Sequence, residues 1–375
     1  MASSAPNQTP IASCLVIGGC GFLGSAIVNS LLQKHPKCRI TAADIRLTNQ
    51  LADSNVKYVT VDITDLSSIT SVIENAKPEA VIHTASPVHG LGREIYMKVN
   101  VDGTKNVVKA CEATGVKVMV YTSSAGVVFD GSPLVNVDET EPFPIIPYDA
   151  YNESKAIAET VALEANGSNG MLTTALRPAG IFGPGDRQLV PGFITVVKNR
   201  QTQWQLGNNT NLFDFTYIDN LAIAHVLAAS VLLHQHATTG VTDPSVDQRK
   251  RLDGTSIFVT NGQPVYFWDF AKAIWCHYGV YNAGSIVLPR SGGLVIAGLA
   301  ELFSKLMGRE PGLTRFRVKF SCAHRYFDIR KAKDLLGYEP EVSLTEGLRR
   351  CIEWFKAEEE KTAAAAAAAA PAEKQ

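Results

Sequence analysis

The chain has 375 residues, with 35 basic and 36 acidic side chains and no long basic run, so its charge gives no support for a nucleic-acid partner. This length suits one large α/β domain with a smaller domain attached. The seven scattered cysteines never form a Cys-x-x-Cys pair, which argues against a disulfide framework and a zinc site, and we expect no metal.

The two ends of the chain differ in composition from the rest. Residues 1–10 are polar without a signal peptide, and residues 357–375 include an alanine-rich low-complexity tail, so we leave both outside the predicted fold. Between them we expect a dinucleotide-binding domain over mainly residues 11–262, with insertions of a second domain after about residue 186. Residues 263–356 are expected to form mainly the smaller, substrate-binding domain.

Residues 14–32 indicate a buried strand, a glycine turn and a helix. The stretch 14–17 is apolar on both faces, as a central parallel strand must be. Glycines follow at 18, 19, 21 and 24, and apolar residues then recur at helical spacing. A turn this tight needs residues without a Cβ, so that backbone N–H groups and the positive end of the helix can meet a pyrophosphate. We therefore predict a dinucleotide site.

An acidic residue supports this prediction. Asp44 ends a second apolar strand, 40–43, about 20 residues after the last glycine, where a ribose-binding acid is expected. A carboxylate accepts hydrogen bonds from a ribose 2′-hydroxyl and repels a 2′-phosphate. We expect NAD as the cofactor, with NADP as the alternative because Arg46 lies two residues further on.

Further strands are predicted at residues 57–61, 80–85 and 117–122, with helical segments between them. This alternation indicates right-handed βαβ crossovers and a doubly wound parallel sheet of the Rossmann type. Ligands of such sheets bind at the carboxyl ends of the strands. The polar residues that fall there are Asp44, Asp62, Thr84, Ser123 and Ser124.

A Tyr-x-x-x-Lys pair opens a predicted helix after the fifth strand. Tyr151 and Lys155 are four residues apart, so they share a helix face. A nearby ammonium favours phenolate, and we expect it to lower the tyrosine pKa by about 1 to 3 units. Such a tyrosine exchanges a proton with an alcohol or a carbonyl near neutral pH.

With these motifs the sequence resembles the extended short-chain dehydrogenase/reductase superfamily and, within it, the 3β-hydroxysteroid dehydrogenase family, over roughly residues 11–356. The resemblance implies that Ser124 is the catalytic serine, with Ser123 as a second choice, and that Asn100 is a structural asparagine of the site. It implies that Ser124 and Tyr151 hold the substrate, and that Tyr151 and Lys155 also contact the cofactor. The other cofactor contacts that it implies are Gly18, Gly19, Cys20, Gly21, Phe22, Leu23, Gly24, Asp44, Asp62, Ile63, Thr84, Ala85, Ser86, Pro178, Ala179, Gly180 and Ile181.

Two later stretches, 214–222 and 326–340, look like the steroid and sterol branch of that family. The residues around Tyr151 are most similar to the members that act on sterol 4α-carboxylates. The resemblance implies oxidation of a 3β-hydroxyl to a ketone with loss of CO₂, in ergosterol-type sterol biosynthesis. The alternatives are another 3β-hydroxysteroid dehydrogenase, a nucleotide-sugar epimerase or dehydratase, and a redox-sensing regulator without chemistry.

Residues 294–307 are unusually apolar, but 14 residues are too few to span a bilayer, which needs about 20. The stretch is expected either to cap the substrate pocket or to dock on a membrane surface. The resemblance to enzymes of endoplasmic-reticulum sterol synthesis favours peripheral attachment at the cytosolic face of that membrane. It also suggests other enzymes of sterol C4 demethylation as partners, and an oligomer is compatible with the sequence.

Overall fold

The computed structural model describes residues 8–88, 90–239, 250–284, 286–307 and 313–369. The chain divides into two compact units and passes through each of them three times. Unit 1 comprises Met1–Gly180, Asn211–Pro264 and Ala323–Glu341, and unit 2 comprises Ile181–Thr210, Val265–Cys322 and Val342–Gln375.

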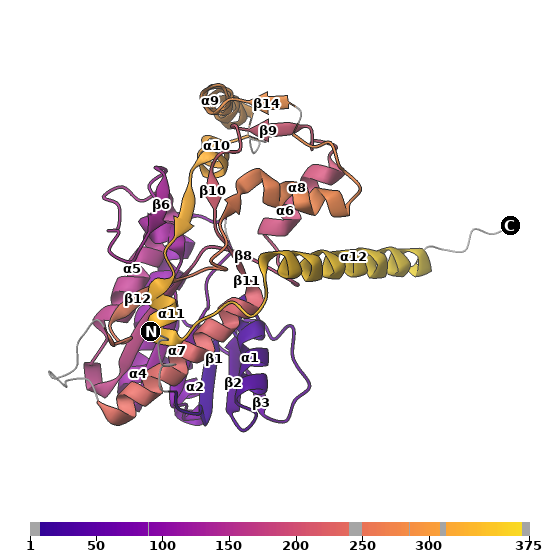
Figure 1. Ribbon diagram of the computed structural model, residues 1–375. Coiled ribbons are helices and arrows are strands. Elements are labelled where there is room, and N and C mark those ends of the chain that lie inside the picture. The colour runs from indigo at the N-terminus through magenta and orange to yellow at the C-terminus, as the bar shows by residue number, and fades with distance from the viewer. Residues whose placement is uncertain (1–7, 89, 240–249, 285, 308–312, 370–375) are drawn as a thin grey trace. The chain divides into compact units, whose positions relative to one another are not determined.

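Unit 1 is built on a parallel sheet of seven strands in the order β12-β7-β5-β4-β1-β2-β3. Figure 1 labels β1, β2, β3 and β12 of this sheet. The strands predicted at 14–17, 40–43, 57–61, 80–85 and 117–122 correspond to β1 to β5, so the predicted doubly wound fold is confirmed. Their bounds are β1 (Ser13–Ile17), β2 (Arg39–Asp44), β3 (Val56–Thr60), β4 (Ala80–His83), β5 (Val118–Thr122), β7 (Leu172–Pro178) and β12 (Thr255–Val259).

The strand order changes direction between β1 and β4. From β1 the chain builds outward through β2 to β3, and it then returns to place β4 on the other side of β1. In an open α/β sheet, this switch point leaves a crevice at the carboxyl ends of the two strands, where ligands bind. The glycine turn follows β1 and Thr84 follows β4, so both lie at the switch point.

Two layers of helices cover the sheet. One layer contains α1 (Phe22–Lys34), which packs on α7 (Ile218–Thr238). In the other layer, α4 (Gly103–Thr114) packs between α2 (Leu66–Ala76) and α5 (Ala150–Glu164). Strands β1, β4, β5 and β7 are buried along their whole length, which explains why β1, β4 and β5 are mostly apolar; β7 also buries Thr173, Thr174 and Arg177.

In the described part of the chain, α7 is the one helix long and apolar enough to cross a membrane by length and composition. Most of its apolar window is buried, and it contacts β4, β5 and β7. The helix belongs to the core of unit 1.

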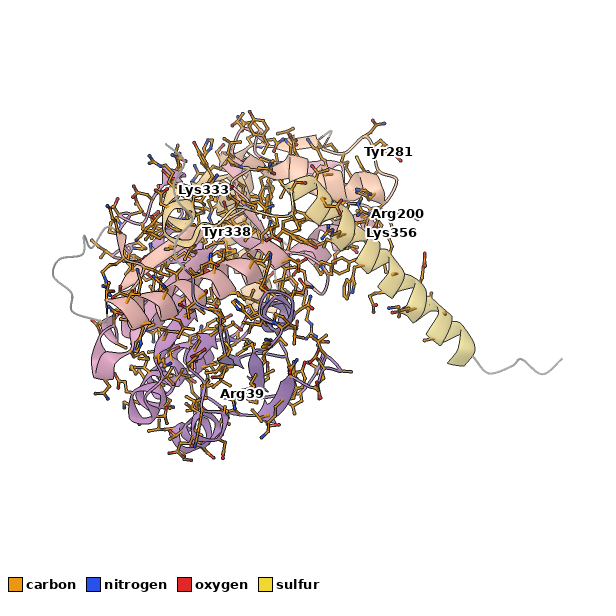
Figure 2. The ribbon with its side chains drawn as sticks, turned by 60° about the horizontal axis from the view of Figure 1, so that its bottom comes forward. Arg39, Arg200, Tyr281, Lys333, Tyr338 and Lys356 are labelled. Carbon is orange, nitrogen blue, oxygen red and sulfur yellow. The ribbon has the colours of Figure 1, made fainter. Side chains whose placement is uncertain are left out.

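The remaining part of unit 1 extends the core at one side of the large sheet. Strand β15 (Arg325–Phe327) pairs in parallel with β10 (Leu212–Phe213) and with β6 (Leu134–Val137). After α11 (Arg330–Leu336), the buried Tyr338, labelled in Figure 2, donates a hydrogen bond to the Thr260 carbonyl at 2.9 Å. Residues 323–341 therefore belong to unit 1, although the segment directly before them, 265–322, belongs to unit 2.

Unit 2 has an aromatic core between α6 (Leu189–Lys198) and α8 (Phe267–His277). Trp275 is fully buried and donates to the Phe193 carbonyl at 3.0 Å, and Phe193 packs on Phe270. Strand β9 (Trp204–Leu206) pairs with β14 (Ile286–Leu288), and α9 (Arg290–Met307) packs on α10 (Arg315–Cys322).

The last helix of unit 2 is α12 (Leu344–Ala369). Its Lys356, labelled in Figure 2, has its ammonium 5.6 Å from the centre of the Tyr278 ring. The helix continues into the alanine-rich tail that we left outside the predicted fold, and the alanines at 363–365 are exposed. The final residues of that tail, 370–375, lie outside the described residues, as do residues 1–7.

Candidate active site

The glycine turn after β1 depends on two close approaches of backbone to backbone. Gly18 has a φ of +83°, and a Cβ there would lie 2.8 Å from the Ala85 nitrogen. A Cβ at Gly24 would lie 1.9 Å from the Gly18 carbonyl oxygen. Only glycine fits at these two positions. The turn thus brings the first turn of α1 against the end of β1.

Gly21 is the N-cap of α1, and no side chain caps this helix end. A Cβ at Gly21 would meet only the Gly18 oxygen, at 3.1 Å, so this glycine leaves room on its outer side. Leu23 is buried in the core, whereas Phe22 is half-buried. This is the kind of backbone cradle that a pyrophosphate requires.

Asp44 closes the turn from the end of β2. One of its carboxylate oxygens, Oδ2, accepts a hydrogen bond from the Cys20 backbone N–H at 3.1 Å, and the other, Oδ1, accepts from the Arg46 N–H at 3.3 Å. The carboxylate is half-buried, and the Arg46 side chain is exposed. A half-buried acid at this position fits a ribose of a dinucleotide.

The residues predicted after β3 and β4 lie at the same edge of the sheet. Asp62 is exposed, and its Oδ1 accepts from the N–H and the hydroxyl of Thr64, both at 2.8 Å. Ile63 is buried, and its side chain fills the space next to Gly103. The Thr84 N–H donates to the Ile17 carbonyl at 2.9 Å, which joins the ends of β4 and β1. Ala85 and Ser86 follow and are half-buried.

The predicted contacts at 178–181 fall in both units. Pro178 ends β7, and Ala179 and Gly180 follow it in unit 1. Ile181 lies on β8 (Gly180–Phe182) and already belongs to unit 2.

Helix α5 presents the Tyr/Lys pair. Asp149 caps the helix, because its carboxylate accepts from the Asn152 N–H at 2.7 Å. Tyr151 follows in the first turn and Lys155 one turn later, on the same face. The cap therefore sets where the helix begins and which residues face the sheet.

Lys155 is almost completely buried, with 2% of its surface exposed. Its ammonium donates a hydrogen bond to the Thr122 carbonyl and lies 4.5 Å from the centre of the Tyr121 ring, both at the end of β5. Burial lowers the pKa of Lys155 to about 7, and the carboxylate of Glu159 opposes this shift. The charge of this lysine thus depends on the groups around it.

Tyr151 has a different environment from the one predicted. Its ring packs edge-on against Tyr96, with 5.6 Å between the ring centres, and its side chain forms a hydrogen bond with Ser86. Burial raises the pKa of Tyr151 to about 12, and the Asp149 carboxylate acts in the same direction. The prediction of a lowered tyrosine pKa is therefore wrong for this arrangement, since the Lys155 ammonium is directed to β5 and desolvation dominates.

The structure separates the two candidate serines. Ser123 is buried, and its hydroxyl donates to the Glu159 carboxylate at 2.5 Å. Ser124 is half-buried, and its hydroxyl oxygen accepts from the Gly126 N–H at 3.1 Å. That bond leaves the Ser124 hydroxyl hydrogen available for a substrate oxygen. Ser124 therefore suits substrate binding, and Ser123 suits a supporting role.

Asn100 lies in a π-helical segment, Met97–Asp102, and is buried. Its amide nitrogen donates to the Ser154 hydroxyl at 2.9 Å, and Ser154 is part of α5. Within the described residues, the Asn100 side-chain oxygen has no hydrogen-bond partner. The bond to α5 fits the structural role expected for Asn100, and π-helical turns are frequent at functional sites.

Sequence reasoning did not identify several residues of this site. Asp149 and Tyr96 contact or influence Tyr151, and Glu159 and Arg177 form an ion pair behind the serines. A signal for Glu159 was present, because it continues the four-residue spacing of Tyr151 and Lys155 along one helix face. Asp149 lies two residues before Tyr151 and caps the same helix, whereas Tyr96 and Arg177 come from segments distant in sequence.

The fold and the site define a dinucleotide-dependent enzyme of the extended short-chain dehydrogenase/reductase class. The model of the 3-beta hydroxysteroid dehydrogenase/isomerase family matches residues 15–290. The chain belongs to this family.

Relatives from distant organisms match nearly the whole chain. The sterol-4-alpha-carboxylate 3-dehydrogenase (decarboxylating) of Schizosaccharomyces pombe is 51% identical over 93% of this chain and 99% of its own length. The enzyme of the same name from Saccharomyces cerevisiae is 46% identical over 92% and 99%. The corresponding protein of Homo sapiens is 32% identical over 93% and 90%.

Among solved structures, UDP-glucose 4-epimerase of Thermus thermophilus in complex with NAD has a TM-score of 0.66 at 21% identity and covers 92% of this chain and 99% of its own. The dTDP-glucose 4,6-dehydratase of Bacillus anthracis in complex with NAD has a TM-score of 0.68 at 19% identity, over 93% and 98%. These structures share the fold.

The site generates a prediction about the ionisation of Tyr151. Replacing Asp149→Asn removes a carboxylate that raises the Tyr151 pKa, while the amide oxygen still caps α5. We expect the phenol pKa to fall by about one unit, since a like charge nearby disfavours phenolate. NMR titration of ¹³C-labelled tyrosine measures the shift, with Tyr151→Phe used for assignment.

The matched control is Asp138→Asn, an exchange of the same kind elsewhere in unit 1, which is expected to leave the Tyr151 titration unchanged. An unchanged or higher Tyr151 pKa in Asp149→Asn would contradict this account of the site.

Proposed function

We propose that this protein oxidises the 3β-hydroxyl of a sterol 4α-carboxylate to the 3-ketone, and that the carboxylate is then lost as CO₂. The observation that carries the proposal is the identity of 43–51% to fungal enzymes of this name over 91–93% of the chain. The site geometry is consistent with it, because Ser124, Tyr151 and Lys155 are all present beside a dinucleotide cradle.

The cofactor is of the NAD type, and the cradle of Gly18, Gly21 and Gly24 with Asp44 would hold it. When bound, NAD supplies the acceptor for the hydride that leaves C3 of the sterol. Asp44 favours NAD over NADP, because a half-buried carboxylate would repel a 2′-phosphate.

Oxidation requires that the 3-hydroxyl gives up a proton as hydride leaves its carbon. Ser124 donates a hydrogen bond to the substrate oxygen and orients it, and Tyr151 accepts the proton as the general base. Lys155 supplies a positive charge on the same face of α5, one turn after Tyr151. The product is a 3-ketone.

A ketone β to a carboxylate allows decarboxylation without a further cofactor. When the bond from C4 to the carboxyl carbon breaks, its electron pair enters the carbonyl as an enolate, and CO₂ leaves. Tyr151, now protonated, and Ser124 can donate hydrogen bonds to the enolate oxygen, as an oxyanion hole does. The high pKa of Tyr151 suits this second step, because the phenol keeps its proton and remains a donor.

The function predicts one CO₂ per reduced cofactor. We expect the protein, incubated with NAD and a 4α-carboxysterol labelled in its carboxyl group, to release labelled CO₂ and NADH in equal amounts. Tyr151→Phe is expected to lower turnover by about 10²-fold or more and to leave NAD binding nearly intact, since only the proton-transferring oxygen is lost.

UDP-hexoses and a 3β-hydroxysteroid without a carboxylate serve as control substrates. Reduced cofactor without labelled CO₂ would return the protein to the broader hydroxysteroid dehydrogenases. Reaction with UDP-hexoses alone would favour the nucleotide-sugar enzymes.

The cofactor preference is tested separately. We expect kcat/KM to be higher with NAD than with NADP, and Asp44→Ala to weaken NAD binding by about tenfold or more, since hydrogen bonds to charged groups contribute about 1.5–3 kcal/mol. Asp53→Ala, an exposed aspartate in the same unit, is the control. A preference for NADP in the unaltered protein would show that Arg46 dominates.

We also propose that the protein attaches peripherally to the cytosolic face of the endoplasmic-reticulum membrane through α9. One face of this helix exposes large apolar side chains, about 60–65% exposed at Val295, Leu299, Leu302 and Phe303. Leu294, at the start of the apolar stretch, is half-buried, and the side chain of Leu306 lies outside the described residues. Arg317 on the adjoining α10 is exposed, where an anionic headgroup could meet it.

Attachment through α9 predicts that Leu299→Gln with Phe303→Gln weakens binding to lipid vesicles by about tenfold or more, because each buried apolar side chain contributes about 1.5–3 kcal/mol. Cosedimentation with vesicles measures this. Tyr281→Gln is the control, an aromatic residue of unit 2 that lies outside α9, is 78% exposed and is labelled in Figure 2. Unchanged cosedimentation of a folded double variant would leave attachment to a partner enzyme of sterol C4 demethylation as the explanation.

A further inference from the structure

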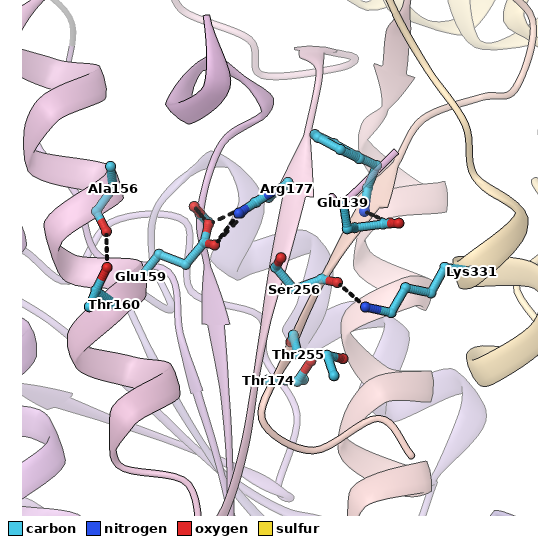
Figure 3. A network of polar contacts seen from close by, with 11 residues as sticks. Glu139, Ala156, Glu159, Thr160, Thr174, Arg177, Thr255, Ser256 and Lys331 are labelled. Atoms are coloured by element: carbon cyan, nitrogen blue, oxygen red, sulfur yellow. Dashed lines mark hydrogen bonds and ion pairs between the residues drawn. The ribbon is translucent and has the colours of Figure 1, made fainter. Parts of the chain in front are cut away.

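A buried ion pair lies behind the two serines, between α5 and β7 (Figure 3). Glu159 is fully buried and Arg177 is 4% exposed. The guanidinium contacts both carboxylate oxygens: Nη2 lies 2.6 Å from Oε1, and Nε lies 3.1 and 3.0 Å from Oε1 and Oε2. The hydroxyl of Ser123 donates to Oε2 at 2.5 Å. The carboxylate thus has three donor groups on it and touches no exposed surface.

Stability alone does not account for this pair. Removing two charges from water is costly, and a buried ion pair is often no more stabilising than apolar residues of similar volume. The surroundings would accept apolar side chains, since the Arg177 guanidinium lies 5.3 Å from the ring centres of both Phe143 and Phe258. One guanidinium nitrogen, Nη1, has no hydrogen-bond partner among the described residues. These features indicate that Glu159 and Arg177 have a role beyond packing.

The first role of Glu159 is to connect helix α5 to the end of strand β5. Glu159 lies on α5, four residues after Lys155 and eight after Tyr151, so the three share one face of the helix. Ser123 directly precedes Ser124 at the end of β5. One carboxylate therefore ties the helix with the tyrosine and lysine to the strand end with the substrate-binding serine.

The second role is electrostatic. The Lys155 ammonium lies over the Tyr121 ring of β5, and its charge also acts on His83 of β4 and His225 of α7. Burial lowers the pKa of both histidines, to about 3 and about 4, so they carry no charge at neutral pH. The His225 ring is accordingly neutral: Nδ1 donates to the Leu221 carbonyl, and Nε2 accepts from the Thr122 hydroxyl. The negative charge that favours the ammonium comes from Glu159.

Lys155 must stay protonated while Tyr151 gives up its proton. Burial acts against both conditions, because it lowers the pKa of the lysine and raises that of the tyrosine. A fixed negative charge next to the lysine widens the pH range in which the pair is active.

We infer that Glu159 is a positioning residue of the reaction. Through Ser123 it holds the end of β5 that carries Ser124, and through its charge it keeps Lys155 an ammonium. Arg177 is the counter-ion that allows the carboxylate to be buried. The inference rests on the proposed dehydrogenase function, which the unaltered protein tests independently of any variant.

The first test is Glu159→Gln, assayed from pH 6 to pH 10 with NAD and a 4α-carboxysterol. The amide oxygen still accepts from Ser123, but the charge is lost. We expect kcat to fall by about 10²-fold at neutral pH, with KM for the sterol and Kd for NAD nearly unchanged. The pH at which kcat declines on the alkaline side should move down by about one unit, because the lysine loses its proton earlier. Activity should recover partly on acidification, which a purely structural defect would not produce.

Two further variants separate the roles. Ser123→Ala removes the link to the strand end and leaves the charge, so we expect a lower kcat with an unshifted pH profile. Glu164→Gln makes the same exchange at an exposed position of α5 and is the matched control, expected to behave like the unaltered protein.

If Glu159→Gln does not fold, the double variant Glu159→Leu with Arg177→Met keeps the inference testable, since it removes both charges together. We expect it to retain its thermal midpoint and NAD affinity and to lose about 10²-fold in kcat. Full turnover in this variant would overturn the inference, and so would a large drop in its thermal midpoint, which would show that the pair serves stability. If the unaltered protein is inactive on sterol carboxylates but turns over another control substrate, the proposed function fails, and the same variants are assayed on that substrate.

Discussion

The site depends on burying a lysine ammonium at the end of a parallel strand. Lys155 is held by the Thr122 carbonyl and the Tyr121 ring, so both its partners come from β5. A charge in this position requires a compensating group, and the next turn of the helix supplies one in Glu159. That carboxylate in turn requires Arg177, which extends the requirement to β7. The relative position of helix and sheet therefore follows from charge compensation as well as from apolar packing.

The same burial determines which protonation states the enzyme uses. A phenol with a pKa of about 12 is a stable hydrogen-bond donor, and its phenolate, once formed, is a strong base. In the proposed reaction both properties are used, because the proton that Tyr151 takes from the alcohol corresponds to the one that the enolate needs after CO₂ leaves. The overall conversion of alcohol and carboxylate to ketone and CO₂ releases no net proton. A tyrosine that returns its proton within one turnover can operate with a high pKa, provided that Lys155 remains charged.

Much of the fold could be predicted because it follows from local sequence patterns. Short apolar stretches indicated β1, β2, β4 and β5, alternation with helical segments indicated β3, and the glycines at 18 and 24 occupy positions where a Cβ has no space. The tyrosine and lysine were predictable from their spacing on one helix face. The environment of the Tyr151 phenol was not, because Ser86 and Tyr96 reach it from distant segments, and the spacing of Tyr151 and Lys155 leaves out the effect of Asp149, the cap of the same helix. The direction of the Lys155 side chain depends on its contacts with β5, and the four-residue spacing of Tyr151 and Lys155 does not predict those contacts. The return of residues 323–341 to unit 1 likewise depends on long-range contacts such as that of Tyr338 with Thr260.

In the proposed reaction, the residues that perform the chemistry do not select the substrate. Ser124, Tyr151 and Lys155 serve any oxidation of a secondary alcohol, and solved structures of nucleotide-sugar enzymes share this fold at about 20% identity. The identity to sterol-4-alpha-carboxylate dehydrogenases, in contrast, covers 93% of the chain, so it includes segments of unit 2 as well as the sheet. Unit 2 carries the exposed apolar face of α9, a property that suits an enzyme whose substrate is dissolved in lipid. If both proposals hold, contact with the membrane is a requirement on unit 2, whereas proton transfer by Ser124, Tyr151 and Lys155 is a requirement on unit 1.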